Sequence, residues 1–590
     1  MTTTSSKWRP TFHLNAPSGW LNDPCGLGYD PSTRLYHVAF QWNPRGNDWG
    51  NVSWGNSTSY DMVSWKTSPD PYLTPSTDYD CYGIFTGCLR PTDIDGSPGA
   101  LTCIYTSVKH LPIHYTLPYV QGCESLSLAV SHDSGLTWRR LSCNPILSGP
   151  PCHLQVTGWR DPFVCFWRGS SMQLSQSETG DHLYGFLSGG VVGETPTVFV
   201  YIINPNDLRD WKFIGCLVDV GLNFRPSRWS GDFGVNWEVA NVLELSSEED
   251  GISRTFVIVG AEGCLQSKDD VTGSRIKAQT ARTPRQQLWM ALKAKSSDDA
   301  SSNSALATYS FAGIFDHGCY YAANSFYDPV TGRHVFYGWV TEEDLPDNLR
   351  HAQGWSGLIS LPRTVQLQVL HNIVRARSSK LQTITSIETE ADSRGTYTVR
   401  TLGTQPDDRL KKLRAKASSF TLQNLTLHSS CSADSIMTLK TSRWEVEARF
   451  AVHKQCTRAG IQITHSAKLK TSTVLTWEPL TENFTVERPH PTYPGINHGV
   501  ESAPHTLFTF RDVHDNEVEE TLRIRAIFDK SILEVFINER TALSTRIYLD
   551  EDRCSQLGFF AEGGLNGDKG FLSSPAAVLL EAQVWDGLEA

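Results

Sequence analysis

Short apolar runs broken by turn residues dominate the first two thirds of the chain. Typical runs cover residues 35–40, 196–202 and 333–339, and Gly, Pro, Asn or Asp bounds each of them. Runs of this length, rich in β-branched and aromatic residues, are typical of strands. The pattern predicts a succession of strands up to about Arg363, followed by a last strand and a connector over residues 365–381.

From about Ala417 the pattern changes to alternation of apolar and polar residues. The clearest examples are residues 444–450, 522–528 and 532–537. Alternation predicts strands with one buried and one solvated face, as in a sandwich of two antiparallel sheets. The stretch 388–416 between the two patterns is charged and rich in turn residues, which indicates a boundary.

A weak internal repeat marks the first part of the chain. The segment Ser59–Trp65 is echoed by Ser131–Trp138 and again by Asn204–Trp211, and the three Trp residues are spaced 73 positions apart (138−65 and 211−138). Even repetition of one β-turn unit is typical of propeller blades, each a four-stranded sheet. Three ordinary hairpins are the alternative, against which the even spacing counts.

These patterns predict an all-β chain of at least two domains. We expect a first domain over residues 1–380, a linker region over residues 381–416 and a β-sandwich over residues 417–590. A chain of 590 residues is also too long for one ordinary domain.

Composition and charge exclude several classes of partner. Hydrophobic residues make up 39% of the chain and charged residues 19%, as in soluble globular proteins. The net charge of −11 argues against nucleic acid or an anionic membrane as a partner. No run approaches the 18 apolar residues of a transmembrane helix. The first ten residues hold no apolar signal region, so we expect an intracellular protein; the alternative is a secreted protein whose signal has been removed.

The cysteines predict neither a disulfide scaffold nor a metal site. The 14 Cys residues are scattered, and they form no CxxC pair and no zinc-ligand spacing. Buried free thiols fit this density better than disulfides. We therefore expect no metal and no cofactor.

Three acidic residues lie in distinctive local contexts. Asp23 lies in the sequence WLNDPCG (residues 20–26), Asp161 in WRDP (159–162), and Glu238 in NWEVAN (236–241). Glycoside hydrolysis needs two carboxyl groups with different surroundings, one ionised and one protonated, and a third acid could bind sugar hydroxyls. Taken alone, Asn-Asp-Pro is more often a simple turn.

These motifs together resemble those of glycoside hydrolase family 32, the invertases, inulinases and fructosyltransferases. The resemblance extends over most of the chain and includes FQWNP (40–44), WGNVSWG (49–55), FTG (85–87) and GWSGLISLPR (354–363). Cys25 replaces the second Asn of the usual NDPNG, and VAN replaces the usual CP after the acidic Glu. Both departures resemble a fungal subgroup rich in sucrose fructosyltransferases.

The resemblance implies a five-bladed β-propeller followed by a β-sandwich, and a retaining β-fructofuranosidase mechanism. It makes Asp23 the nucleophile that forms a covalent fructosyl-enzyme, Glu238 the acid/base and Asp161 the transition-state stabiliser. We expect the two catalytic carboxyl groups about 5–5.5 Å apart, as in retaining glycosidases.

The residues around Glu238 support its role. The apolar neighbours Trp237, Val239 and Ala240 suggest partial desolvation, which would raise the pKa of Glu238 and keep it protonated. The competing residues are Glu244, Glu248, Glu249 and Glu262; Glu248 and Glu249 lie in an acidic, Ser-rich stretch that is typical of a solvated loop.

Further residues match the sugar-binding positions of the family. Aromatic rings pack against apolar sugar faces, and amides reach the hydroxyls. For the fructose side, the resemblance implies Trp20, Asn22, Gln41, Trp49, Phe85, Thr86 and Arg160. For the glucose or acceptor side, we expect Glu262 and either Tyr320 or Tyr321.

We therefore expect an enzyme that acts on sucrose and transfers the fructosyl group to make fructo-oligosaccharides. A mainly hydrolytic invertase or inulinase is the first alternative. A non-catalytic sugar-binding propeller is the second, and the presence of both catalytic carboxylates disfavours it. The sequence leaves the oligomeric state open.

Overall fold

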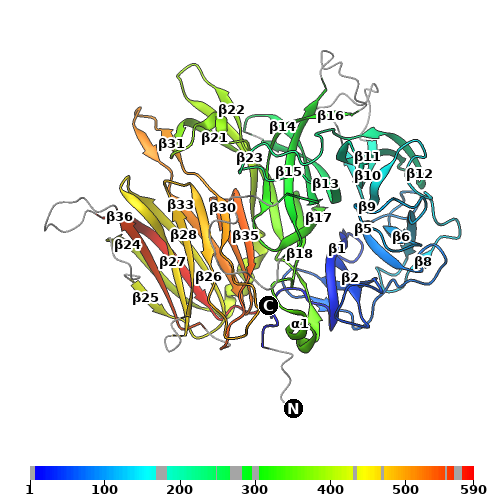
Figure 1. Cartoon of the computed structure of the whole chain (residues 1–590), viewed down its shortest axis with the longest axis horizontal. Helices are drawn as coiled ribbons and strands as arrows, with labels where there is room; N and C mark the ends of the chain where they lie inside the picture. Colours follow the sequence, from blue (N-terminus) through cyan, green and yellow to red (C-terminus); the bar gives the residue numbers. More distant parts are fainter. Residues whose placement is uncertain are drawn as a thin grey trace.

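The computed structural model of the chain describes residues 7–167, 182–247, 249–265, 282–295, 305–428, 435–466, 471–551, 554–563 and 575–590. Within these residues nearly all of the regular secondary structure is β-strand, as expected, and the strands form seven sheets. Figure 1 shows them in two groups, with the sheets of the N-terminal residues on the right and those of the C-terminal residues on the left.

The first four sheets are built mainly from consecutive strands. The first contains β1 (Gly19–Asp30), β2 (Leu35–Asn43), β3 (Ser53–Ser59) and β4 (Lys66–Thr67), with β19 (Trp355–Ser356) paired parallel to β1. The second contains β5 (Gly83–Arg90), β6 (Leu101–Val108), β7 (Glu124–Ser131) and β8 (Arg139–Arg140). The third contains β9 (Val156–Trp167), β10 (His182–Val191), β11 (Thr195–Asn204) and β12 (Asp207–Cys216). The fourth contains β13 (Asn236–Ser247), β14 (Ile252–Glu262), β15 (Arg285–Ala294) and β16 (Ala307–Asp316).

The fifth sheet is larger and collects strands from distant parts of the chain. It contains β17 (Tyr320–Asp328), β18 (Arg333–Val340), β20 (Leu358–Ile359), β21 (Arg363–Ala376), β22 (Glu388–Ala391), β23 (Tyr397–Pro406), β31 (Phe508–Arg511) and β32 (Glu517–Glu519). The short helix α1 (Asp347–Gln353) lies between β18 and β19, and Gly354 ends it with a φ of 75°. A left-handed residue after a helix is usually glycine, because glycine has no Cβ to clash.

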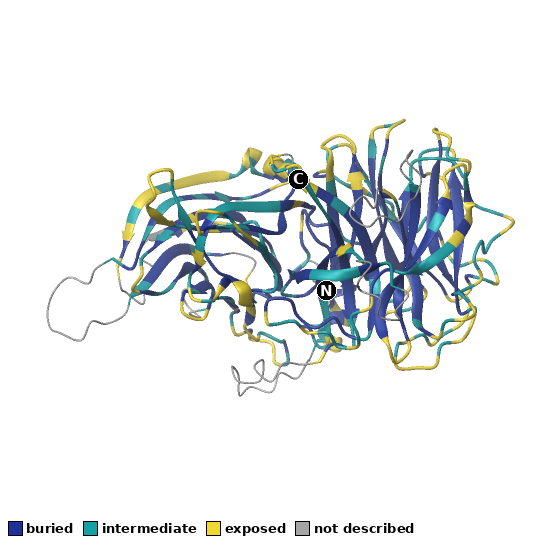
Figure 2. Ribbon diagram, turned by 90° about the horizontal axis from the view of Figure 1, so that it is seen from above, coloured by how far each residue is buried: buried dark blue, intermediate teal, exposed yellow. Residues whose placement is uncertain are grey.

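The first strands of these five sheets form a closed ring. Each of β1, β5, β9 and β13 contacts the next, and β17 contacts both β13 and β1. The strands of the ring are buried along most of their length (Figure 2), which explains why the sequence shows apolar runs rather than clean alternation here. Closure of the ring brings residues more than 200 positions apart to one axis.

The Trp repeat falls at one place in three successive sheets. Its copies connect β3 to β4, β7 to β8 and β11 to β12, so each links the third strand of a sheet to the fourth. In the second copy, Ser131 Oγ lies 2.7 Å from Asp133 Oδ1 and accepts the Gly135 N–H at 2.8 Å. The repeat is therefore one turn unit per sheet, as predicted.

The C-terminal residues form two six-stranded sheets that share one core. One sheet contains β24 (Ser418–Leu427), β37 (Ala577–Asp586), β26 (Arg443–Val452), β33 (Leu522–Asp529), β34 (Ile532–Ile537) and β35 (Thr541–Arg546). The other contains β25 (Ser435–Thr438), β36 (Gln556–Gly563), β27 (Cys456–Ser466), β28 (Thr471–Glu478), β29 (Asn483–Glu487) and β30 (Glu501–Pro504). Residues from both sheets, among them Trp444 and Trp477, join a single apolar cluster.

The expected linker, residues 381–416, instead holds regular structure. It contains the 3₁₀ helices η3 (Leu381–Thr383) and η4 (Asp408–Lys416) and the strands β22 and β23. β23 pairs with β21 from Arg363 to Ile373, so the segment completes the fifth sheet. Its charges obscured the strand in the sequence; Arg400 of β23 is buried and pairs with Glu388 and Glu390 of β22.

Buried ion pairs join the two groups of sheets. Arg363 is fully buried and donates to Asp316 Oδ2 at 2.9 Å and to Glu534 Oε2 at 2.7 Å. Asp316 ends β16 and Glu534 lies on β34 of the sandwich. His13 Nε2 also lies 3.2 Å from Glu534 Oε1. The sandwich is thereby fixed against the outer side of the fourth and fifth sheets.

Candidate active site

A two-residue bulge recurs in the first strand of each of the five N-terminal sheets. At every bulge, two residues of the first strand face one residue of its neighbour. The bulged pairs are Asn22–Asp23 in β1, Phe85–Thr86 in β5, Asp161–Pro162 in β9, Val239–Ala240 in β13 and Ala322–Ala323 in β17. Bulges re-aim side chains and are frequent beside active sites. All three predicted catalytic acids lie within a bulge or directly before one.

The backbone at three of these bulges is strained. Asp161, Val239 and Ala322 have φ values of 60°, 48° and 52°, in the left-handed region, which costs about 1–2 kcal/mol for a residue other than glycine. The strained backbone also makes specific contacts. The Val239 N–H donates to Asp161 Oδ2 at 3.1 Å, and the Ala240 N–H donates to Ser188 Oγ at 2.8 Å. The bulge in β13 therefore directs an N–H toward a carboxylate of the site.

The Asp23 carboxylate is surrounded by donors. It accepts hydrogen bonds from Thr86 Oγ1 at 2.6 Å, Gln41 Nε2 at 3.4 Å and Asn22 Nδ2 at 3.2 Å. These donors favour the ionised form. Burial opposes them and, together with the charge of Glu238, raises the pKa of Asp23 to about 6. Asp23 is thus held in one orientation and is ionised above that pH.

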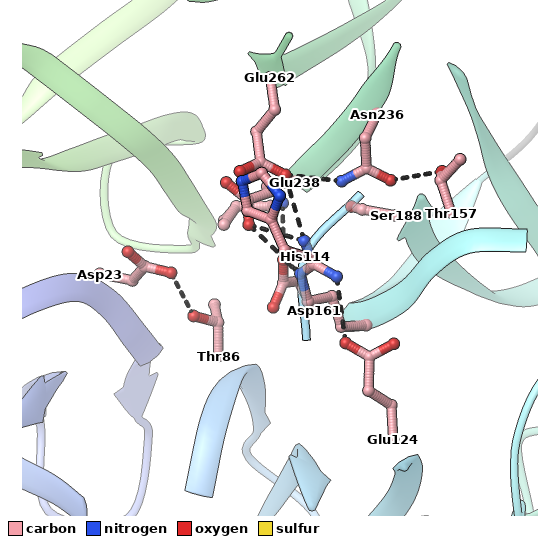
Figure 3. Close-up of polar contacts among 12 residues, drawn as sticks. Asp23, Thr86, His114, Glu124, Thr157, Asp161, Ser188, Asn236, Glu238 and Glu262 are labelled. Carbon is pink, nitrogen blue, oxygen red and sulfur yellow. Dashed lines mark hydrogen bonds and ion pairs between the residues drawn. The ribbon is translucent and has the colours of Figure 1, made fainter. Parts of the chain in front are cut away.

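The labelled carboxyl groups of Glu124, Asp161, Glu238 and Glu262 lie in one cluster (Figure 3), and Arg160 connects them. Its Nη1 donates to Glu124 Oε1 at 3.1 Å, and its Nη2 donates to Glu238 Oε1 at 2.9 Å and to Glu262 Oε2 at 3.3 Å. Its Nε lies 4.0 Å from Asp161 Oδ2. The surrounding carboxylates outweigh the effect of burial and hold the pKa of Arg160 well above its usual value. A single guanidinium thus connects four acids.

Glu238 has more polar surroundings than its sequence neighbours suggested. Besides Arg160, the Tyr321 hydroxyl donates to its Oε2 at 2.8 Å. The adjacent Trp237 is fully buried, and its Nε1 donates to the Phe233 carbonyl at 3.0 Å. Successive residues of a strand face opposite sides, so apolar neighbours in the sequence did not make an apolar pocket around the carboxyl group.

The glutamates that compete with Glu238 for the acid/base role lie in different places. Glu262 joins the cluster, whereas Glu244 lines a different cavity of about 730 Å³, together with Leu27 and Phe163. Glu249 lies in a turn, and Glu248 lies outside the described residues. Among the competitors that the structure describes, Glu262 alone shares the Arg160 guanidinium with Glu238.

The two candidate tyrosines lie on opposite sides of β17. Tyr321 contacts Glu238, and the Arg285 guanidinium lies 4.7 Å from the Tyr321 ring centre. Tyr320 instead packs in the core, with the Arg363 guanidinium 4.2 Å from its ring centre. The expectation that Tyr320 binds substrate is therefore corrected, and Tyr321 remains.

A glycine makes room for Tyr321. Gly260 pairs with Glu238 across β13 and β14. A Cβ at this position would lie 2.7 Å from Tyr321 Cζ and 2.8 Å from its hydroxyl oxygen. No real Cβ contact is that short, so a side chain here would displace the Tyr321 hydroxyl from Glu238.

Aromatic residues line the Asp23 side of the site. Trp20 Nε1 donates to Asn22 Oδ1 at 3.3 Å, and its ring meets the Trp339 ring edge-on at 5.8 Å. Phe85 meets the Trp49 ring edge-on at 5.9 Å, and Trp49 is 49% exposed. Exposed aromatic faces beside buried polar groups are typical of sugar-binding sites. Asn22, Gln41 and Thr86 thus contact Asp23 directly, Trp20 contacts Asn22, and Trp49 contacts Phe85, the residue before Thr86.

Glu262 is held by a second polar chain. Asn236 Nδ2 donates to Glu262 Oε2 at 2.8 Å, and Thr157 Oγ1 donates to Asn236 Oδ1 at 2.7 Å. Burial and the charge of Glu238 raise the pKa of Glu262 to about 7. Burial raises the pKa of Tyr115, and the charge of Glu262 raises it further. Because Tyr115 lies in the loop between β6 and β7, this loop approaches the site.

The site contains more acids than cations. Its carboxyl groups are those of Asp23, Glu124, Asp161, Glu238 and Glu262, and its guanidinium groups are those of Arg160 and Arg285. Burial raises the pKa of Asp161 well above its usual value and also raises that of Glu124. The cluster therefore retains protons at pH values where exposed carboxyl groups would have lost them.

Glu124 and Arg285 also belong to the site but were not predicted from the sequence. Glu124 begins an apolar strand, and its contact with Arg160 joins two different sheets. Arg285 follows a segment without a motif, yet it stacks on Tyr321 and Trp339. No local pattern marks either residue. Asn236, by contrast, lies within the NWEVAN motif and could have been proposed.

The described part of the chain offers no group of three or more His, Cys, Asp and Glu residues suited to a metal ion. The 13 cysteines that it includes are free thiols. Its helices are all too short or too polar to cross a membrane.

Comparison with known proteins identifies the family. Residues 13–377 match the model of the glycosyl hydrolases family 32 N-terminal domain, and residues 409–586 match the family 32 C-terminal model. An extracellular exo-inulinase of Aspergillus ficuum is 28% identical over 386 residues, which cover 62% of this chain and 63% of the inulinase. An insoluble β-fructofuranosidase isoenzyme 2 of Oryza sativa subsp. indica is 27% identical over 369 residues, which cover 61% of this chain and 54% of the relative. The chain thus spans less than two thirds of the length of either relative.

Solved structures resemble the whole chain. The fructosyltransferase of A. japonicus has a TM-score of 0.78 and 25% identity, with 99% of this chain and 95% of that chain covered. The β-fructofuranosidase of Aspergillus kawachii complexed with glycerol has a TM-score of 0.82 at 24% identity and the same coverage, which shows a common fold. Because the first family model alone covers more than half of the residues, the chain belongs to family 32 of the glycosyl hydrolases, a family of enzymes.

Proposed function

We propose that the five N-terminal sheets are the blades of a five-bladed β-propeller that carries the active site. The closed ring of first strands supports this number, since β17 contacts β1. In this proposal the catalytic part continues through β23 and η4 to residue 416, and the β-sandwich follows from residue 417. The bulges of the five blades then face one end of the central channel.

In the proposed reaction, the enzyme cleaves sucrose by double displacement. Asp23 attacks the anomeric carbon of fructose and forms a covalent fructosyl-enzyme. Glu238 protonates the leaving glucose and then deprotonates the acceptor. Asp161 binds fructose hydroxyls through the oxygen that does not accept the Val239 N–H. Support comes from the contribution of Glu238 to the raised pKa of both aspartates, which indicates that the three carboxyl groups are close.

The observation that carries this proposal is the convergence of three carboxyl groups from three sheets. Asp23, Asp161 and Glu238 belong to β1, β9 and β13 and surround one polar centre. A sugar-binding module without catalysis needs neither a partly buried Asp with three donors nor an acid that shares an Arg with three others. The geometry therefore favours a catalytic site.

We further propose that the fructosyl group passes mainly to sucrose, giving fructo-oligosaccharides. The similarity to the A. japonicus fructosyltransferase supports transfer, and the similarity to exo-inulinase keeps hydrolysis as the alternative. An acceptor sugar would bind beside Glu238, near Glu262 and Tyr321. Its hydroxyl would then compete with water for the proton-accepting oxygen of Glu238.

Incubation with concentrated sucrose tests the function. Free glucose in excess of free fructose indicates transfer, and equal amounts indicate hydrolysis. If the wild-type protein releases neither sugar, both activities are contradicted, and a non-catalytic sugar-binding propeller is the remaining alternative. The Asp23→Ala variant is the matched blank, because it removes the proposed nucleophile alone.

A further inference from the structure

Glu124 is the most deeply buried acid around Arg160. It is the first residue of β7 and has no solvent exposure, whereas the side chains of Glu238 and Glu262 are 22% and 18% exposed. Figure 3 shows Glu124 and Glu262 on opposite sides of the cluster. Glu124 is therefore out of reach of a sugar in the site.

Glu124 accepts hydrogen bonds from two adjacent residues of β9. Its Oε2 accepts the Trp159 N–H at 2.9 Å, and its Oε1 accepts Arg160 Nη1 at 3.1 Å. The first bond anchors the carboxylate to the backbone of the strand that carries Arg160. The second fixes the guanidinium, whose other nitrogens then point to Glu238 and Glu262. A buried charge is retained only with such partners.

We propose that Glu124 is a positioning residue for the reaction, which holds Arg160 in place and takes up part of its positive charge. Arg160 then orients Glu238 without drawing the proton from it. This inference rests on the proposed function, because it assigns Glu238 as the proton donor. It adds a residue that touches neither substrate nor reacting atoms and acts through Arg160.

The sign of the effect follows from the charges around Arg160 and Glu238. The groups around this cluster are Glu124 from β7, Asp161 from β9, Glu262 from β14, Arg285 from β15, Tyr321 from β17, Asp23 from β1, and Tyr115 and Tyr119 from the loop between β6 and β7. When Glu124 loses its charge, the carboxyl groups of Glu238 and Glu262 experience more of the positive charge of Arg160 and less negative charge from their surroundings. Both changes favour the ionised forms of carboxyl groups that share Arg160, so the alkaline limb of activity should move to lower pH.

The Glu124→Gln variant tests this inference. Gln keeps the size of the side chain and an acceptor oxygen but removes the charge. We expect the alkaline limb of the pH profile of kcat/KM for sucrose to move down by about one pH unit, as a nearby unit charge commonly does. At the optimum, we expect kcat/KM to fall by about tenfold or less. A purely structural role would lower stability and leave the limb where it is.

Two further variants serve as controls. Glu124→Asp keeps the charge, so its alkaline limb should stay at the wild-type pH even where kcat falls. Glu445→Gln removes a buried carboxylate of the sandwich that pairs with Arg414 and Arg525, and it should leave the limb unmoved.

An unmoved limb in Glu124→Gln would overturn the inference. If that variant does not fold, a shift of a full unit in Glu124→Asp would overturn it equally, since the charge is still present. A wild-type protein without activity on sucrose would instead contradict the proposed function, and the inference would fall with it. The two failures are thus distinguishable.

Discussion

At the residue scale, some residues of the site can be recognised from sequence motifs, whereas others come together only in the folded structure. Asp23, Asp161 and Glu238 lie in short motifs whose chemistry is recognisable. Glu124 and Arg285 lie in ordinary strands, and their significance comes from contacts between sheets. Sequence reasoning also could not choose between Tyr320 and Tyr321, because the choice depends on which side of β17 faces the channel.

Removal of either proposed catalytic group should abolish most turnover. We expect Asp23→Ala and Glu238→Ala to lower kcat on sucrose by about a thousandfold or more, since each has a separate chemical role. Circular dichroism should show an intact fold. Glu244→Ala, on the same strand as Glu238 but in another cavity, is the control with near-normal turnover. Near-normal rates for Glu238→Ala would transfer the acid/base role to Glu262.

The acidic limb of the pH–rate profile should report Asp23. Its pKa of about 6 means that kcat/KM falls as the pH drops through 6, because the nucleophile becomes protonated. Thr86→Val removes a 2.6 Å hydrogen bond to the ionised form. This should raise the pKa of Asp23 and move the acidic limb up by about one pH unit.

Removal of a threonine hydroxyl outside the site is the control for Thr86→Val. Thr102 donates to the Thr92 carbonyl within the second sheet, so Thr102→Val should leave the acidic limb unchanged. A Thr86→Val limb at the wild-type pH would show that another group limits activity in acid.

At the element scale, the turn repeat and most strands were predictable, and the bulges were not. The Ser-Asp-Trp turn has a local chemistry that the sequence displays, as in Ser131 and Asp133. A bulge changes pairing by one residue and leaves little trace in hydrophobicity. The strand β23 was missed because charged neighbours masked its short apolar run, and residues 381–416 were assigned to a linker.

The strain in the β17 bulge is measurable. Ala322 has a φ of 52°, whereas the adjacent Ala323 is not in the left-handed region, and both are fully buried. Substitution by Gly removes one methyl group in each case, but only at Ala322 does it relieve strain. Ala322→Gly should therefore be more stable than Ala323→Gly by about 1–2 kcal/mol. Equal free energies of unfolding in urea would show that the bulge stores no strain.

At the scale of the whole molecule, the sequence indicated the order of the two parts but not their attachment. Alternation after Ala417 predicts a sandwich, yet β31 and β32 return from that region to the fifth sheet. The pairs formed by Arg363 join residues that are 47 and 171 positions apart. Contacts at such separations depend on the completed fold and have no local signature.

The Arg363 cluster should matter for the stability of the whole chain. Arg363→Met leaves Asp316 and Glu534 buried without their shared cation, which typically costs about 3–5 kcal/mol. Arg523→Met removes an exposed partner 4.0 Å from Glu539 and should cost less than about 1 kcal/mol. Urea unfolding of both variants measures the difference. Similar losses would mean that the buried pairs do not hold the two parts together.

The most direct test of the central claim is the anomeric configuration of the fructosyl group when it is first released or transferred. Double displacement through Asp23 requires the fructosyl group to keep its β configuration, whether water or sucrose accepts it. NMR at early times on sucrose should therefore show β-fructofuranose as the first anomer released, and β linkages in any transfer product. Initial release of α-fructofuranose would contradict the covalent mechanism and the role assigned to Asp23.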